Sequence, residues 1–145
     1  MIKIICVGKI KESYLNDLIN DYKTRISKYH KIEIIELKDS NIDTEKNELL
    51  KVINTKDYNI CLDIKGTKLN SIELSNMIKD TFTSGYGTIS FIIGSSDGIS
   101  EEVKSICNKR ISFSDLTFPH GLFRGLLLEQ IYRSFKIMNN ESYHK

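Results

Sequence analysis

The stretch TISFIIGSSDGISEE, residues 88–102, contains the unit from which this chain is built. Residues 88–93 are mostly apolar in succession, which is typical of a strand buried on both faces of a sheet. A turn from Gly94 to Gly98 follows. Ser100 is placed to cap a short helix, and the carboxylates of Glu101 and Glu102 suit the positive end of its dipole. The stretch predicts a strand, a loop and a helix in succession.

The same alternation continues on both sides of this unit. Further apolar, β-rich runs lie at residues 2–7, 32–37, 58–63 and 110–113, and apolar residues at helical spacing lie at 14–29, 49–53 and 72–82. Asn70 or Ser71 can cap the last of these helices, and Pro119 can open a longer one that runs to residue 138. The pattern predicts an α/β fold with a parallel sheet and helices on both faces, formed by a single domain, residues 1–145.

The charge balance excludes one class of RNA-binding protein. The chain has 21 basic and 19 acidic residues, so it lacks the strong positive field of proteins that bind nucleic acid mainly by releasing counterions. Any RNA contact must come from a local patch. Basic residues gather in two groups, Lys3, Lys9, Lys11, Lys23, Arg25, Lys28 and Lys31 near the N-terminus and Arg124, Arg133, Lys136 and Lys145 near the C-terminus. For the first group, a solvated surface of mixed charge is an equally good interpretation.

The cysteines and the N-terminus indicate where the protein works. Cys6, Cys61 and Cys107 lie far apart, without the close pairs of a zinc or redox site, so no metal is expected. Cys6 and Cys61 fall in predicted strands, where a thiol usually serves as a small apolar side chain. The sequence opens without a basic-then-apolar leader and contains no apolar run long enough to cross a bilayer. We expect a cytoplasmic protein without membrane association.

Three connections hold most of the turn residues: GTKLNS from residue 66, GSSDG from 94 and FSDLTFPHG from 113. Each follows a predicted strand. Ligands of open parallel sheets bind beyond the carboxyl ends of the strands, so a pocket is expected where these loops meet. The glycine loop lacks the residues of a P-loop and could be an ordinary tight turn. In the third loop, Asp115 or Thr117 could simply cap the next helix, and His120 could bond within its first turn.

Polar residues also gather near the C-terminus. Glu129, Gln130, Tyr132 and Arg133 lie within about one turn of the last predicted helix, and Arg124 lies five residues before Glu129. Such a strip is more often solvated or used at a subunit contact than catalytic. The final residues Tyr143, His144 and Lys145 add a phenol, an imidazole and an ammonium group to this region. Although termini usually fray, this tail is dense in titratable groups.

The segment TFPHGLFRGLLLEQIYRSFKI, residues 117–137, and the terminal YHK resemble the signature of the ribosomal large-subunit methyltransferase H family, within the SPOUT superfamily. The runs KIICVGKIKESYL, LDIKG and IIGSSDGIS match the same family in order. The resemblance covers essentially the whole chain. It implies an α/β fold with a C-terminal trefoil knot, a homodimer, and transfer of a methyl group from S-adenosylmethionine to N3 of pseudouridine 1915 in the 23S ribosomal RNA of assembled ribosomes. By resemblance, the residues that hold the cofactor are Leu62, Gly94, Phe113, Ser114, Asp115, Leu116, Thr117 and Phe118.

The resemblance also gives a hypothesis for catalysis. The N3 of pseudouridine is an imide nitrogen, which must lose its proton to attack well, so a base or a donor to the imide anion would help. We expect His144 to be the base and Tyr143 and Arg133 to orient it or the RNA, with the tail reaching the partner's cofactor. Gly121 and Gly125 depart from the bulkier residues of the family and could allow close helix packing at the dimer contact. Two alternatives are a non-enzymatic nucleotide-binding or ribosome-associated module and a methyltransferase for another RNA.

Overall fold

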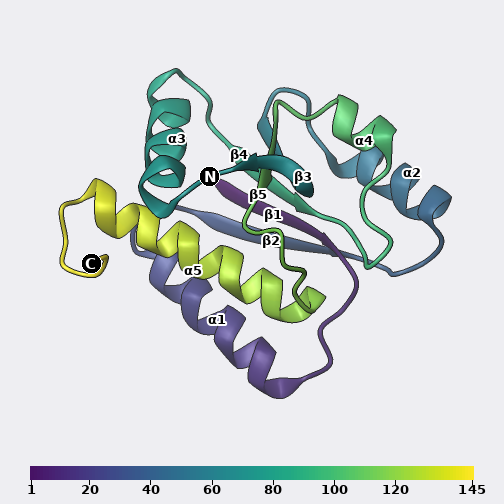
Figure 1. Ribbon diagram of the computed structural model, residues 1–145, viewed down its shortest axis with the longest axis horizontal. Helices are drawn as coiled ribbons and strands as arrows, with labels where there is room; N and C mark the ends of the chain where they lie inside the picture. Colours follow the sequence, from purple (N-terminus) through teal and green to yellow (C-terminus); the bar gives the residue numbers. More distant parts are fainter.

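The computed structural model describes residues 1–145, which form a five-stranded, all-parallel sheet with strand order β2-β1-β4-β3-β5 (Figure 1). The strands are β1 (Ile2–Val7), β2 (Ile32–Leu37), β3 (Tyr58–Lys68), β4 (Ile89–Ile93) and β5 (Lys109–Ser112). The helices are α1 (Ser13–Ser27), α2 (Ile42–Val52), α3 (Ser71–Thr83), α4 (Glu101–Ser105) and α5 (His120–Met138). The expected α/β fold is confirmed. No helix combines the length and the apolar character needed to cross a membrane.

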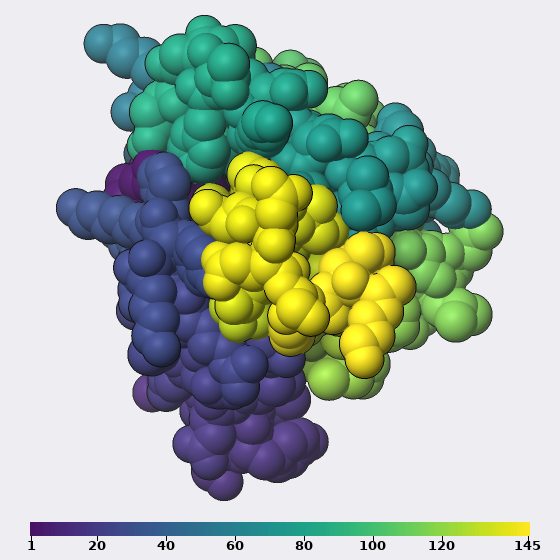
Figure 2. Space-filling model, turned by 90° about the vertical axis from the view of Figure 1, so that its left-hand side faces the viewer, coloured from purple at the N-terminus to yellow at the C-terminus, as the bar shows by residue number.

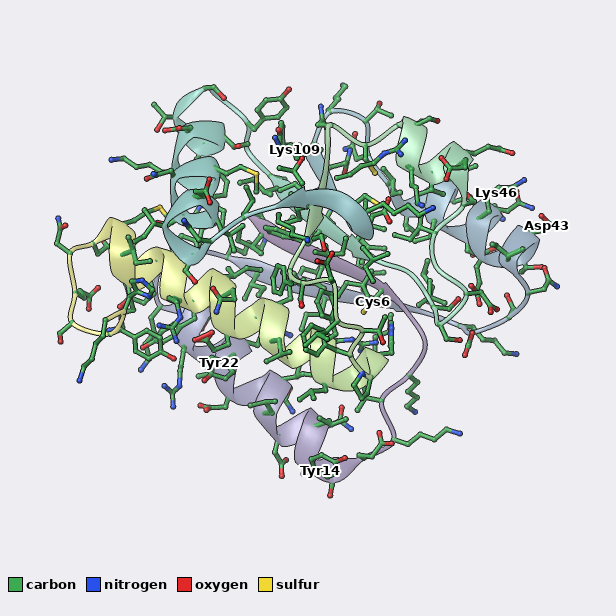
Figure 3. The ribbon with its side chains drawn as sticks, viewed as in Figure 1. Cys6, Tyr14, Tyr22, Asp43, Lys46 and Lys109 are labelled. Carbon is green, nitrogen blue, oxygen red and sulfur yellow. The ribbon has the colours of Figure 1, made fainter.

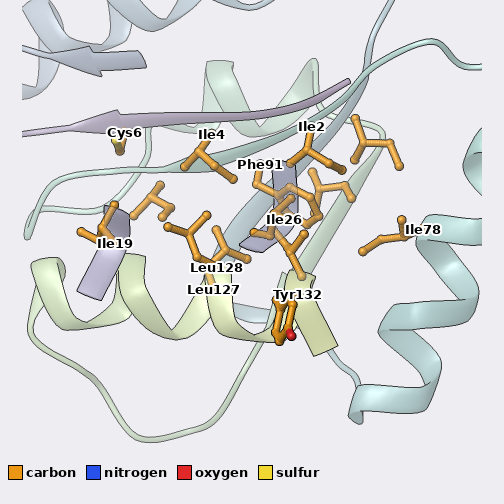
Figure 4. Packing of buried hydrophobic residues seen from close by; sticks show 14 of the residues in the cluster. Ile2, Ile4, Cys6, Ile19, Ile26, Ile78, Phe91, Leu127, Leu128 and Tyr132 are labelled. Carbon is orange, nitrogen blue, oxygen red and sulfur yellow. The ribbon is translucent and has the colours of Figure 1, made fainter. Parts of the chain in front are cut away.

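Helices cover both faces of the sheet, as expected. Ile2, Ile4 and Cys6 of β1 face α1 and α5 in the larger apolar cluster, which also includes residues of α3 (Figure 4). Ile5 and Val7 of the same strand pack with α2 and α4 on the opposite face. Alternate residues of a strand point to opposite faces, so a strand covered on both sides must be apolar in succession. Cys6 and Cys61 are buried apolar residues, as expected.

Strand β3 is longer than its apolar run suggested. GTKLNS was expected to be a loop, but Gly66, Thr67 and Lys68 still belong to the strand. The pairing of β3 with β5 shifts register, so that both Leu62 and Thr67 pair with Ile111. A Cβ at Gly66 would lie 2.7 Å from the Arg110 carbonyl carbon, so a side chain is excluded where the two strands approach. The expectation was wrong because the polar extension is held by pairing with β5, which no apolar pattern reveals.

The helix ends follow local chemistry. Asn70 caps α3 through a capping box with Glu73, and Ser100 caps α4, both as expected. Helix α2 begins at Ile42, earlier than residue 49, because Asn41 caps a first turn rich in polar residues. Pro119 precedes α5 in extended conformation and is not its first helical residue, and no side chain caps this helix. Capping by Asp115 or Thr117 is therefore ruled out.

Helix α5 lies beside α1 (Figure 1), and two glycines set their separation. A Cβ on Gly121 would lie 2.9 Å from Leu15 Cδ1, and one on Gly125 would lie 2.6 Å from Leu18 Cδ2. These glycines allow α1 of the same chain to approach α5 closely. The close packing is therefore within one chain, whereas the sequence suggested a contact between the subunits of a dimer. Arg124 was expected on an exposed strip but is only 1% exposed, because its side chain lies on the face of α5 that packs against the sheet.

Candidate cofactor cavity and C-terminal cluster

A cavity of about 540 Å³ lies beside the middle of β3, at Leu62–Ile64, and at the carboxyl ends of β4 and β5. These strands are neighbours in the sheet, and the loops after β4 and β5 meet at the cavity as predicted, whereas no residue of GTKLNS lines it. The lining residues are Leu62, Asp63, Ile64, Ile93, Gly94, Ser95, Ser96, Gly98, Ile99, Ile111, Ser112, Phe113, Ser114, Leu116, Thr117, Phe118, Pro119, His120 and Phe123.

The glycine loop forms one wall and has no room for a side chain at Gly94. A Cβ there would lie 2.6 Å from both the Gly98 carbonyl oxygen and Ile99 Cγ1. Gly98 has a φ of 84°, a conformation that favours glycine, and its N–H donates to the Ser95 carbonyl over 2.9 Å. Ser95 Oγ in turn donates to the buried carboxylate of Glu45 on α2 over 2.8 Å. The loop is therefore tightly folded and anchored, unlike a free surface turn.

The loop between β5 and α5 forms the opposite wall. Ser112 Oγ donates to the Ser114 carbonyl over 3.0 Å, and Ser114 Oγ accepts from the Leu116 N–H over 2.9 Å. The rings of Phe113 and Phe118 lie 5.1 Å and 6.1 Å from that of Phe123, between centroids. The wall is thus fixed by its own hydrogen bonds and by an aromatic cluster, although Leu116 itself is 72% exposed.

Seven of the eight residues expected to hold the cofactor line this cavity. The eighth, Asp115, does not: its carboxylate forms an ion pair with Lys68 on the extension of β3. The cavity suits S-adenosylmethionine in three respects. Its volume lies within the usual range of about 300–1,000 Å³ for ligand sites, Gly94 and Gly98 line it without side chains, and Leu62, Ile99 and Phe113 supply apolar walls.

The buried Arg124 links His120, which lines the cavity, to Glu36 and Gly8. Arg124 donates to Glu36 Oε2 at the end of β2 over 2.5 Å and to the Gly8 carbonyl after β1 over 2.9 Å. Its Nη2 also lies 3.3 Å from His120 Nε2, which must accept because a guanidinium only donates. Burial, and then the charge of Arg124, lower the pKa of His120. The sequence suggested only a hydrogen bond within the first helical turn for His120, and a solvated position for Arg124. Glu36 lies 88 residues before Arg124, so no local pattern indicates that the two side chains pair.

The three expected catalytic residues form a separate cluster at the end of α5. Arg133 donates from Nε to Glu129 Oε1 over 2.9 Å, and its Nη1 lies 3.1 Å from His144 Nδ1. Tyr143 Oη donates to the same Glu129 oxygen over 3.3 Å, and Arg133 lies over the Tyr143 ring at 4.8 Å. Burial, followed by a hydrogen bond with Tyr22, raises the pKa of Tyr143. The structure thus brings these residues together, with Glu129 at their centre.

This cluster lies far from the cavity of its own chain. The α5 residues that line the cavity, His120 and Phe123, stand 13 and 10 residues before Arg133, which at 1.5 Å per residue is about 20 Å and 15 Å. Figure 2 shows the C-terminal residues on a face between α3 and α1. Within one chain, therefore, the expected base and the expected cofactor site do not meet.

Comparison with known proteins gives a consistent picture. Residues 1–144 match the family model described as "Predicted SPOUT methyltransferase". The chain is 47% identical, over 157 aligned positions, to the ribosomal RNA large subunit methyltransferase H of Clostridium botulinum strain Langeland, and the match covers 99% of both chains. The identity and coverage are the same for the protein of strain Kyoto.

A likeness to a solved structure supports the fold alone. The structure of a probable methylase family protein from Haemophilus influenzae Rd KW20 superposes with a TM-score of 0.59 at 11% sequence identity. The superposition covers 99% of this chain and 70% of the other.

Proposed function

Because this chain belongs to the ribosomal RNA large subunit methyltransferase H family of SPOUT methyltransferases, which use S-adenosylmethionine, we propose that it methylates N3 of pseudouridine 1915 in the large-subunit RNA of assembled ribosomes. The observation that carries this proposal is the cavity formed by the middle of β3 and the loops after β4 and β5, with Gly94 on one wall. In this proposal residues 1–145 act as one catalytic domain.

The protein's own residues would align S-adenosylmethionine with the target base and exclude water from the reacting atoms. When bound, S-adenosylmethionine supplies a methyl group on a positively charged sulfur. The backbone around Gly94 and Gly98 and the loop 113–118 would hold the cofactor, and Leu62, Ile99 and Phe113 would keep water from its methyl group. Alignment of the reacting atoms is the main contribution that an enzyme can make to a displacement at carbon.

We further propose that the C-terminal segment is threaded as a trefoil knot. The chain leaves β5 at one edge of the sheet and lines the cavity together with the middle of β3 and the loop after β4. It then reaches the end of β1, where Arg124 bonds to the Gly8 carbonyl, and α5 turns back between α1 and α3. This path, together with the family, supports a knotted C-terminal segment.

The proposed enzyme is a homodimer that pairs along the outer face of α5. Leu122 on this face and Tyr14 on α1 are exposed apolar residues, at 37% and 69%, and Tyr14 points away from the chain (Figure 3). In an antiparallel pairing of two α5 helices about a two-fold axis near Leu126, Arg133 of one chain would face Pro119 of the other, because both lie seven residues from the axis. That pairing would bring the C-terminal cluster of one subunit to the cavity of its partner.

The hydrogen bonds of the cluster suggest how His144 would act. Arg133 only donates, so neutral His144 accepts at Nδ1 and carries its proton on Nε2. His144 becomes a base at Nδ1 once Arg133 turns toward RNA phosphate, and Tyr143 then orients the ring. The proton of N3 would pass to His144 as the N3–methyl bond forms and the carbon–sulfur bond breaks, with the sulfur keeping the electron pair.

Methyl transfer to purified ribosomes tests the proposal. Radiolabelled S-adenosylmethionine is supplied with whole ribosomes, isolated large subunits or free ribosomal RNA, and the labelled nucleotide is then mapped. We expect label at N3 of one pseudouridine, and far more of it in whole ribosomes than in free RNA. Label at another nucleotide would overturn the assigned target, and cofactor binding without any transfer to RNA would overturn the activity.

A further inference from the structure

A second cavity, of about 380 Å³, lies between the start of α3 and the middle of α5. Its lining residues are Leu69, Asn70, Ser71, Leu74, Ile111, Ser112, Phe113, Phe118, Leu126 and Gln130. Four of them, Ile111, Ser112, Phe113 and Phe118, also line the cofactor cavity. The two cavities therefore share a wall.

The methyl acceptor must lie beside the methyl donor, which makes this shared wall informative. A nucleophile attacks the methyl carbon from the side opposite the sulfur, so its site must adjoin the cofactor cavity. A third cavity, of about 390 Å³, meets the cofactor cavity only at Pro119 and His120 and is bordered by the charged side chains of Lys9 and Glu12. The second cavity has the more suitable walls for a planar ring, because Phe113, Phe118, Leu69, Leu74 and Leu126 are apolar or aromatic.

One polar group at the far end of the second cavity is held in a fixed orientation. Gln130 Oε1 accepts from Ser71 Oγ over 2.7 Å, and Gln130 Nε2 donates to Glu129 Oε2 over 3.0 Å. An amide has two donors and two acceptor positions, so one N–H and one lone pair remain. These two groups lie in one plane and can pair with an adjacent N–H and C=O of a base.

Pseudouridine has such an edge when its N3 is the nucleophile. Its sugar is attached through carbon, so N1 keeps a proton, and N1–H lies beside the C2 carbonyl. In uridine, N1 carries the sugar and this donor is missing. A site that pairs with N1–H would therefore favour pseudouridine, since a buried partner left unpaired costs free energy.

We propose that the second cavity receives the target base, flipped out of the RNA, and that the Gln130 amide reads its N1–H and C2=O edge while N3 faces the cofactor cavity. This inference rests on the proposed function and adds the residue that selects pseudouridine over uridine. Ser71 is a positioning residue, because it holds the Gln130 amide in the orientation that pairs with the base.

The test compares ribosomes that carry pseudouridine at the target position with ribosomes that carry uridine there. For Gln130→Ala we expect kcat/KM on pseudouridine ribosomes to fall roughly tenfold to a hundredfold, the loss expected for a two-bond base contact. On uridine ribosomes the change should be small, so that the preference of the wild type disappears. Calorimetry should show an unchanged Kd for S-adenosylmethionine, because Gln130 does not line the cofactor cavity.

Two further variants distinguish the loss of a contact with the base from a general loss of folding. Asn76→Ala removes an exposed amide from α3 outside both cavities and should leave both rates unchanged. Gln130→Glu keeps an acceptor for N1–H but loses the donor, so it should retain part of the preference. If folded Gln130→Ala kept the wild-type rates and preference, the inference would be wrong while the function stood. If the wild type methylated neither kind of ribosome, the proposed function itself would fail.

Discussion

Gly94 shows how one missing side chain shapes the cofactor cavity. In Gly94→Ala the new Cβ would meet the backbone of Gly98 at 2.6 Å, so the loop must move. We expect about 1–3 kcal/mol of lost unfolding free energy, as for other overpacked sites, and a weaker Kd for S-adenosylmethionine by calorimetry. Gly87→Ala is the matched control, because nothing lies within 4 Å of its Cβ. Equal affinity in the two variants would show that the loop does not cradle the cofactor.

His120 makes stability depend on pH. Burial and Arg124 lower its pKa in the folded state below the ordinary 6.5, so the unfolded state binds the proton more readily. The free energy of unfolding should therefore fall as pH drops below about 6.5, and remain unaffected by this group above that value. Burial also lowers the pKa of His30, which contributes with the same sign.

The measurement is urea unfolding from pH 7.5 to 5 for the wild type and His120→Asn. The variant should show a shallower loss of stability on acidification, with the remaining slope due in part to His30. An identical slope in both proteins would contradict the assignment to His120.

At the scale of elements, the contact between α1 and α5 depends on the absence of a side chain at Gly125. Gly125→Leu should cost about 1–3 kcal/mol of unfolding free energy, because the added side chain meets Leu18. Gly125→Ala should be nearly neutral, since the gain in helix propensity of about 1 kcal/mol offsets the displacement of Leu18 Cδ2. In a double-mutant cycle, Leu18→Ala should restore part of the stability of Gly125→Leu. Additive effects would mean that the two residues do not share this contact.

Local patterns predicted elements best where burial and capping act along the chain. The alternation of strands and helices, the caps at Asn70 and Ser100, and the meeting of the loops after β4 and β5 could all be deduced from nearby residues. The extension of β3 could not, because its polar residues are ordered by pairing with β5, over 40 positions away in sequence. The early start of α2 was missed because its first turn is polar and depends on the Asn41 cap.

The candidate site, like the fold, could be predicted from the sequence only in part. Loop residues such as Phe113 and Thr117 were assigned from a family motif, and they line the cavity. Arg124 was misplaced because its partners, Glu36 and Gly8, come from strands more than 80 residues earlier. The second cavity has no motif of its own, since it forms where α3, β5 and α5 meet.

At the scale of the whole molecule, mixed dimers test whether the tail acts on the partner. One subunit would carry Gly94→Val, which displaces the loop that forms one wall of its cavity, and the other would lack residues 143–145. If the tail acts across the dimer, the mixed dimer keeps one complete site and should recover about half of the wild-type methylation of ribosomes. Each variant alone should be inactive. A mixed dimer as inactive as its parents would place the tail on its own subunit's cavity.

The position of β1 between β2 and β4 in the sheet has a consequence for the time at which the protein folds. Ile2 pairs with Ile89, 87 positions later, and the N-terminal ammonium donates to the Gly87 carbonyl. The first strand to be synthesised, β1, therefore cannot pair with β4 until more than half of the chain has been made. Pairings so distant in sequence slow folding. We expect nascent chains that end before residue 93 to remain sensitive to protease, and protection to appear only after release from the ribosome that made them.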